Sequence, residues 1–154
     1  METENNSFQI RKLKEKDLDE VMSIWLSSNL DTHTFISADY WKNNFDMVKE
    51  AIAGAEVYIC EGKGERKGNI LSFIGIVPDD YIAGFFVQKQ FRSQGVGKSL
   101  LNYAKSKHST LALKVFTKNT RAIQFYQREG FIIQEESLDT FTNEKEYFMV
   151  WKTK

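Results

Sequence analysis

The chain has 154 residues, 42% hydrophobic and 27% charged, and its 21 basic and 21 acidic side chains leave no formal net charge. This length favours one domain over residues 1–154 that needs no disulfide, and one cysteine with two histidines cannot make the usual structural zinc site, so we expect no metal. The neutral balance gives no support for nucleic-acid binding, and no apolar run is long enough to span a membrane, so we expect a cytoplasmic protein.

Hydrophobic periodicity predicts the element order β-α-α-β-β-β-α-β-α-β-β, that is, a mixed α/β or α+β domain with a central sheet. In chain order, the expected elements are a strand at 8–12, helices at 17–28 and 37–53, strands at 57–61, 70–77 and 81–87, a helix at 97–107, a strand at 111–116, a helix at 120–129, and strands at 131–138 and 146–152.

Local signals mark several helix ends. Asp17 with Glu20 three residues later resembles a capping box, in which each side chain accepts from the other residue's backbone. Ser37 is a candidate cap for the second helix, and Gly54 and Gly130 are candidate stops. Residues 29–36, between the first two helices, are expected to form a loop or a broken helix.

The stretch FRSQGVGKSLL, which begins at Phe91, combines glycines with a lysine and a serine. Gly-Lys-Ser at 97–99 matches the end of a Walker P-loop, but Arg92 stands where that motif needs its first glycine. A Rossmann fingerprint fails in the same way, because Leu100 replaces its third glycine. Neither nucleotide-binding motif therefore fits.

A third interpretation begins at Arg92 and reads Arg-x-x-Gly-x-Gly, between a strand and an amphipathic helix. The glycines let the backbone turn tightly, and the free amides of the helix N-terminus attract pyrophosphate. Arg92, Lys98 and Ser99 would add charge and a hydroxyl. The alternative is a plain strand-to-helix turn with solvated basic side chains.

At this point the chain resembles the GNAT superfamily of acetyl-CoA-dependent N-acetyltransferases. The first matching block is residues 86–100, and the second is residues 115–131, with Asn119, Ala122, Tyr126 and the closing Gly130-Phe131 at the family's spacing. The chain departs from the family's frequent residues at Lys89 and at Ser93-Gln94. The family fold implies a mostly antiparallel sheet of about seven strands flanked by four helices.

The resemblance implies that acetyl-CoA is the cofactor. Its pantetheine arm would lie along the strand 81–87, which the family splays from its neighbour, often with a bulge near Val87. The Val87 amide would stabilise the oxyanion of the tetrahedral intermediate, and Tyr126 would protonate the leaving thiolate. Without the resemblance, Tyr126 reads as a packing residue. The implied cofactor-binding residues are Phe85, Phe86, Val87, Arg92, Ser93, Gln94, Gly95, Val96, Gly97, Lys98, Ser99, Asn119, Ala122 and Tyr126.

The general base is left open. Many family members use a carboxylate on the strand 81–87, which has none here, and Asp79-Asp80 before it are expected in a turn. His33 lies in the loop that lines the family's acceptor cleft, so it is a candidate base, against a purely loop-shaping role or a water chain. His33, Phe35 and Trp41 are the candidate acceptor-binding residues, with core packing as the alternative.

The expected function is transfer of an acetyl group to a primary amine by direct attack in a ternary complex. The amine could belong to a small molecule, a protein lysine or a protein N-terminus. The alternative is a non-catalytic acyl-CoA-binding sensor or interaction module. The expected partners are acetyl-CoA and the acceptor, with no nucleic acid or membrane, and the expected state is a monomer or homodimer.

Overall fold

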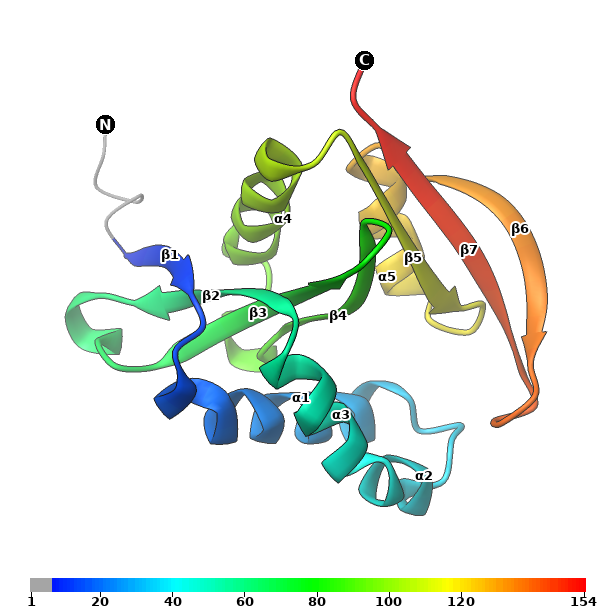
Figure 1. Cartoon of the computed structure of the whole chain (residues 1–154), viewed down its shortest axis with the longest axis horizontal. Helices are drawn as coiled ribbons and strands as arrows, with labels where there is room; N and C mark the ends of the chain where they lie inside the picture. The colour runs from blue at the N-terminus through cyan, green and yellow to red at the C-terminus, as the bar shows by residue number, and fades with distance from the viewer. Residues whose placement is uncertain (1–6) are drawn as a thin grey trace.

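The computed structural model describes residues 7–154 as a seven-stranded sheet with the strand order β1-β2-β3-β4-β5-β7-β6 (Figure 1). The strands are β1 (Phe8–Lys12), β2 (Glu56–Gly62), β3 (Ile70–Val77), β4 (Tyr81–Val87), β5 (Thr110–Phe116), β6 (Ile132–Asp139) and β7 (Glu144–Lys152). The helices are α1 (Leu18–Thr32), α2 (Ala38–Asn43), α3 (Phe45–Ala53), α4 (Val96–Lys107) and α5 (Thr120–Arg128). Among the described residues, no helix has the length and apolar character needed to cross a bilayer.

The predicted element order is confirmed, apart from one helix that divides into two. The expected helix at 37–53 is α2 and α3, separated at Asn44, so five helices flank the sheet and the expected four is wrong. The Asn44 amide Nδ2 donates to the Tyr40 carbonyl at 2.7 Å. This short polar side chain bonds to the backbone of the preceding turn, which is how asparagine competes with helix continuation.

The expected capping box at the start of α1 is wrong. The Asp17 carboxylate accepts from the Lys14 amide at 2.7 Å and from the Arg11 guanidinium at 2.8 Å. Glu20 reaches a different element and accepts from the Ile70 amide at 3.1 Å. Both carboxylates thus tie α1 to neighbouring strands, and neither caps the other's backbone.

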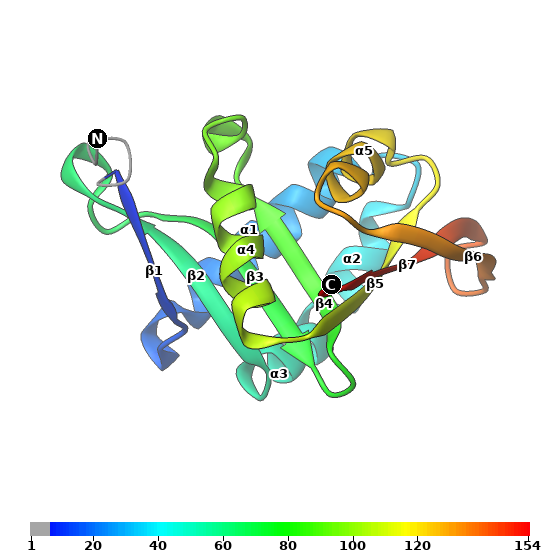
Figure 2. The ribbon, with the colours of Figure 1, turned by 90° about the horizontal axis from the view of Figure 1, so that it is seen from above.

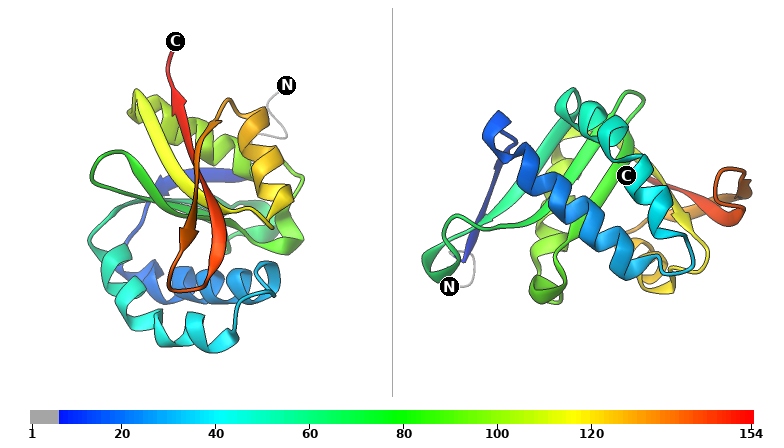
Figure 3. Two further views of the ribbon diagram at one scale, coloured as in Figure 1. Left: turned by 90° about the vertical axis from the view of Figure 1, so that its right-hand side faces the viewer. Right: turned by 90° about the horizontal axis from the view of Figure 1, so that it is seen from below.

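The sheet packs a separate hydrophobic core on each face. Helices α4 and α5 cover one face, and α1, α2 and α3 cover the other (Figure 3). Strand β5 contributes to both cores by alternation: Leu111, Leu113 and Val115 pack with α4 and α5, and Phe116 packs with the α1 cluster. Alternate residues of β5 therefore face opposite halves of the molecule.

The centre of the sheet is open. β4 and β5 run parallel and are paired only at Tyr81 with Ala112, after which the two strands diverge (Figure 2). On its other side, β4 is paired with β3 along its whole length, from Tyr81 to Val87. The register shift in that ladder lies at Ala83, so the bulge expected near Val87 falls earlier in the strand. The result is a cleft between two strands of one sheet.

Candidate active site

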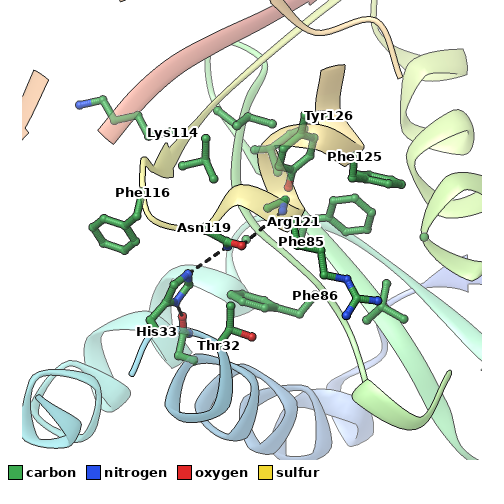
Figure 4. Close-up of a pocket in the computed structure, with 18 of the residues that line it drawn as sticks. Thr32, His33, Phe85, Phe86, Lys114, Phe116, Asn119, Arg121, Phe125 and Tyr126 are labelled. Carbon is green, nitrogen blue, oxygen red and sulfur yellow. Dashed lines mark hydrogen bonds between the residues drawn. The ribbon is translucent and has the colours of Figure 1, made fainter. Parts of the chain in front are cut away.

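A cavity of about 1020 Å³ occupies the cleft between β4 and β5 (Figure 4). Its walls come from α1, α2, β4, the loop before α4, β5, α5 and the β6–β7 hairpin. Thirteen of the sequence-derived candidates line it: His33, Trp41, Phe85, Phe86, Val87, Arg92, Ser93, Gly95, Gly97, Lys98, Asn119, Ala122 and Tyr126. The cavity therefore joins the two matching blocks of sequence.

Four candidates do not line the cavity. Val96 is buried in a core cluster with Cys60 and Leu71. Gln94 is exposed and donates to the Gln90 carbonyl at 3.3 Å, and Phe35 packs edge-on against His33. The fourth is Ser99. The side chains of Gln94, Val96, Phe35 and Ser99 therefore lie outside the site, although the Val96 amide belongs to the helix N-terminus at its edge.

The loop before α4 leaves that helix N-terminus uncapped. Gly95 is the N-cap residue, with φ of 80°, and it has no side chain to accept from the first amides. Ser93 also has a positive φ of 65°. The first backbone bond of the helix runs from the Ser99 amide to the Gly95 carbonyl at 3.0 Å, so the amides of residues 96–98 have no partner within the helix. Such a terminus is an anion-binding arrangement.

Gly97 permits a close approach between α4 and β4. A Cβ at this position would lie 3.2 Å from Val87 Cγ2 and 3.7 Å from Phe85 Cζ. With any larger residue, either the Val87 side chain or the helix N-terminus would have to shift. Glycine therefore holds the free amides beside the open edge of β4.

Arginine side chains line the cavity, and one of them, Arg92, also donates to the Thr32 hydroxyl at the end of α1 at 3.4 Å. Arg92 and Arg121 both line it, and burial together with the charge of Arg121 lowers the pKa of Arg92. Two neighbouring cations with a shared cavity favour a bound anion. Sequence reasoning missed Arg121. Lys98 and Arg121 are basic side chains in the first turns of α4 and α5, where the positive end of the helix dipole disfavours a cation. This mismatch could have been a signal for a bound anion.

The inner edge of β4 presents backbone amides to the cavity. The Gln88 amide donates to the Leu71 carbonyl of β3 at 2.9 Å. Successive amides of an extended strand point to opposite sides, so the Val87 amide points away from β3 and toward the cleft. Because β5 has diverged there, this donor faces open space instead of a neighbouring strand.

Tyr126 lies on α5 at the centre of the cavity wall, with its hydroxyl directed into the cavity (Figure 4). Its ring packs against Phe125 at 5.5 Å and Phe131 at 5.4 Å between centroids. Burial raises the pKa of its hydroxyl well above the ordinary value. The phenol therefore stays protonated, which is the form that a proton donor requires.

His33 takes part in a chain of hydrogen bonds that crosses from α5 to α1. Asn119 Oδ1 accepts from the Ala122 amide at 3.3 Å, and its Nδ2 lies 3.3 Å from His33 Nε2. On the other side, His33 Nδ1 lies 2.8 Å from Asn29 Oδ1, whose Nδ2 donates to the Trp25 carbonyl at 2.9 Å. These directions assign the proton of His33 to Nδ1.

This assignment bears on the candidate base. With the proton on Nδ1, the lone pair on Nε2 is the one that could take a proton, and Asn119 already donates to it. Burial lowers the pKa of His33 to about 4. Because burial disfavours a charge on this ring and Asn119 already occupies its free nitrogen, His33 is poorly placed to take a proton from an ammonium ion. The geometry favours a role for His33 in positioning Asn119 and α5.

Similarity to known proteins bears on the family to which the chain belongs. The family model of the acetyltransferase (GNAT) domain matches residues 53–133. The peptidyl-lysine N-acetyltransferase YiaC of Escherichia coli is 32% identical over 143 residues, which cover 92% of this chain and 95% of that protein. YjaB of the same organism, also named a peptidyl-lysine N-acetyltransferase, is 26% identical over 83% of this chain and 84% of its own.

The solved structures agree on the fold. The solution structure of apo YjaB from Escherichia coli superposes with a TM-score of 0.79 at 23% identity, covering 96% of this chain and 99% of that one. A chain of the NatC complex bound to Gag peptide and CoA superposes with a TM-score of 0.68 at 16% identity, covering 96% and 99%. The alternative of a non-catalytic acyl-CoA-binding module is not favoured by relatives that are named as enzymes. The chain belongs to the GNAT family and is an N-acetyltransferase, which transfers an acetyl group to an amine.

Proposed function

We propose that this N-acetyltransferase takes its acetyl group from acetyl-CoA and transfers it, within a ternary complex, to the ε-amine of a protein lysine. The observation that carries the proposal is the cavity through the splayed sheet, which borders the free amides of α4 and is lined both by arginines and by the carboxylates of Asp139 and Glu146. These charges suit an anionic cofactor and a cationic amine. Lysine is supported by the names of YiaC and YjaB.

The cofactor would enter from the face covered by α4 and α5. Its pyrophosphate would accept from the amides of residues 96–98, with Arg92 and Arg121 supplying charge. Its pantetheine arm would hydrogen-bond to the inner edge of β4 as an added strand. Phe85 and Ala122 would flank the arm. One chain lines the whole cavity, so a monomer suffices for binding.

The chemical step needs an oxyanion donor and a proton donor. The neutral amine attacks the thioester carbonyl, the C–N bond forms, and the carbonyl oxygen gains negative charge. The Val87 amide is placed to stabilise that charge, and one such donor is worth roughly 3 kcal/mol of transition-state stabilisation. As the C–S bond breaks, its electron pair stays on sulfur, and the Tyr126 phenol donates its proton there.

Replacement of Tyr126 by phenylalanine tests this proposal. Phenylalanine keeps the packing of the ring and removes the acidic proton, so we expect kcat to fall by about 100-fold or more while acetyl-CoA binds as before. The measurement is release of free thiol from acetyl-CoA with lysine peptides, protein N-terminal peptides and small amines as acceptors. The matched control is Tyr103→Phe on α4, because Tyr103 packs against Tyr58 and does not line the cavity.

Two outcomes would contradict the proposal. Full activity of Tyr126→Phe would remove Tyr126 from the proton-donor role. Turnover of small amines or N-terminal peptides without turnover of lysine peptides would overturn lysine as the acceptor. Calorimetry of the wild-type protein with acetyl-CoA separates these results from a failure to bind the cofactor.

A further inference from the structure

The part of the cavity lined by β5 and β7 contains a carboxylate with little compensation. Glu146 of β7 is the register partner of Phe116 on β5, and it lines the cavity with Lys114 from the same face of β5. The Glu146 side chain is only 14% exposed. Among the described residues, its one ion-pair partner is Lys114, at the long distance of 3.7 Å from Nζ to Oε1. The Lys114 side chain is 46% exposed, so its ammonium group can turn toward solvent.

A second carboxylate reinforces the negative charge. Asp139 lines the same cavity from the end of β6, and it is fixed by the Phe141 amide at 3.2 Å and the Thr142 hydroxyl at 2.8 Å. Burial and the charge of Asp139 raise the pKa of Glu146, although Lys114 opposes the shift. Two neighbouring carboxylates with one loose cation on Glu146 form a site that gains from a second cation.

The neighbouring side chains suit an amine on an aliphatic stem. Tyr40 of α2 and Tyr81 of β4 line the cavity, and burial and the charge of Glu146 raise the pKa of both hydroxyls. Both phenols therefore stay neutral. Trp41 and Phe116 supply apolar wall, against which a methylene chain can pack while its ammonium reaches the carboxylate.

We propose that Glu146, with Asp139 behind it, binds the ammonium group of the acceptor lysine and accepts its proton before attack. This inference rests on the proposed function and fills the role of base, for which β4 offers no carboxylate. The incoming ammonium displaces Lys114 from Glu146. Once the proton has moved to the Glu146 carboxylate, the nitrogen lone pair is free and the cavity leads it toward the open edge of β4.

The proton balance follows from the bonds. The ammonium gives one proton to Glu146, and the neutral amine forms the C–N bond. The nitrogen of the tetrahedral intermediate then carries a positive charge and gives up a second proton. The leaving sulfur takes the Tyr126 proton, and that second proton restores the phenol. Glu146 returns its proton to solvent, so the turnover produces an amide, a thiol and one free proton.

The experiment compares Glu146→Gln with Glu144→Gln, measuring kcat and KM for a lysine peptide from pH 6 to 10 with free-thiol detection. Glu144 is a matched control, because it lies two residues away on β7, pairs with Lys118 at 3.1 Å and does not line the cavity. We expect Glu146→Gln to lower kcat/KM by about 100-fold near neutral pH, with the rate rising as the peptide amine itself deprotonates at high pH. Glu144→Gln should match the wild type, and Glu146→Asp should restore part of the activity.

A second acceptor separates proton transfer from structural damage. A peptide carrying an aminooxy group in place of the lysine amine is neutral near pH 7 and has no proton to lose before attack. We expect Glu146→Gln to slow this acceptor by less than tenfold. An equal loss with both acceptors, or a Glu146→Gln variant with wild-type kcat/KM and pH profile, would overturn the inference. Wild-type protein that binds acetyl-CoA but acetylates no amine would overturn the proposed function and this inference together, whereas normal lysine acetylation by Glu146→Gln would overturn the inference alone.

Discussion

Replacement of Asn119 by aspartate should raise the pKa of His33. The change is nearly isosteric, and the remaining oxygen can still accept from the Ala122 amide and cap α5. The atom that faces His33 Nε2 at 3.3 Å, however, changes from a donor to a carboxylate oxygen. An acceptor there no longer satisfies the Nε2 lone pair, and its negative charge favours the protonated imidazole.

The magnitude follows from the geometry. A full opposite charge within about 4–6 Å typically moves a pKa by about 1–3 units. Starting from a pKa of about 4 in the wild type, His33 should titrate between about 5 and 7 in the variant. The low pKa of His33 also determines how the stability of the folded protein changes with pH. Wild-type His33 is neutral when folded, so its stabilisation is complete above pH 6.5 and is lost as the pH falls from 6.5 to about 4. Asn119→Asp should lose less stability over that window.

The assay is NMR titration of the two histidine rings, with His108→Asn to assign them. The nitrogen shifts also report which nitrogen carries the proton, and we expect Nδ1 in wild-type His33. His108 is the internal control, because its hydrogen bonds to Asp80 and Glu56 lie far from Asn119 in the fold. A wild-type His33 that titrates near 6.5, or a pKa unchanged in Asn119→Asp, would refute the hydrogen-bond directions assigned here.

Two further predictions concern α4 and its surroundings. Gly97→Ala should weaken acetyl-CoA binding by about tenfold in calorimetry, because the new Cβ would lie 3.2 Å from Val87 Cγ2 and overpacking of this kind typically costs about 1–3 kcal/mol. Adding Val87→Ala to this variant should restore part of the affinity. Unchanged binding by Gly97→Ala would contradict the close approach of α4 to β4. Burial opposes a charge on His108, but its hydrogen bonds to Asp80 at 2.7 Å and Glu56 at 3.1 Å outweigh it and raise its pKa. Its stabilisation is therefore complete below about pH 6.5 and is lost as the pH rises through the folded-state pKa, so thermal unfolding should show this loss in the wild type and a flatter profile in His108→Asn.

Most of the fold could be predicted from hydrophobic periodicity. The bounds of β1, β3 and β4 agree with the expected ranges, because alternation and turn residues delimit them clearly. The break at Asn44 could not be found in this way, since apolar spacing continues across it from Trp41 to Ile52. The hydrogen bond between Glu20 and the Ile70 amide could not be predicted either, because it depends on packing between a helix and a strand far away in the sequence.

The site divides in the same manner. The loop that begins at Arg92 and the side chain of Tyr126 both lie inside the matching blocks, so the sequence pointed to them, and their roles remain proposals. Arg121 lies inside the second matching block but at none of its motif positions, and Glu146 lies outside both blocks. They reach the cavity because β4 and β5 diverge, which brings the first turn of α5 and one face of β7 to a common space. Alternation along β7 indicates only which of its residues share a face. It cannot show that this face borders the cleft between β4 and β5.

The divergence of β4 from β5 also gives the sheet two edges in its interior, besides the outer edges at β1 and β6. Open strand edges can recruit strands from other molecules, and proteins commonly protect them with charged residues, proline or bulges. The segment Phe85-Phe86-Val87 has no charge or proline. It is protected by its position, because α5 and α1 approach the cleft from opposite faces (Figure 4). A folded neighbour would have to displace one of these helices to pair with the segment, so we expect edge-to-edge aggregation in variants in which α5 detaches.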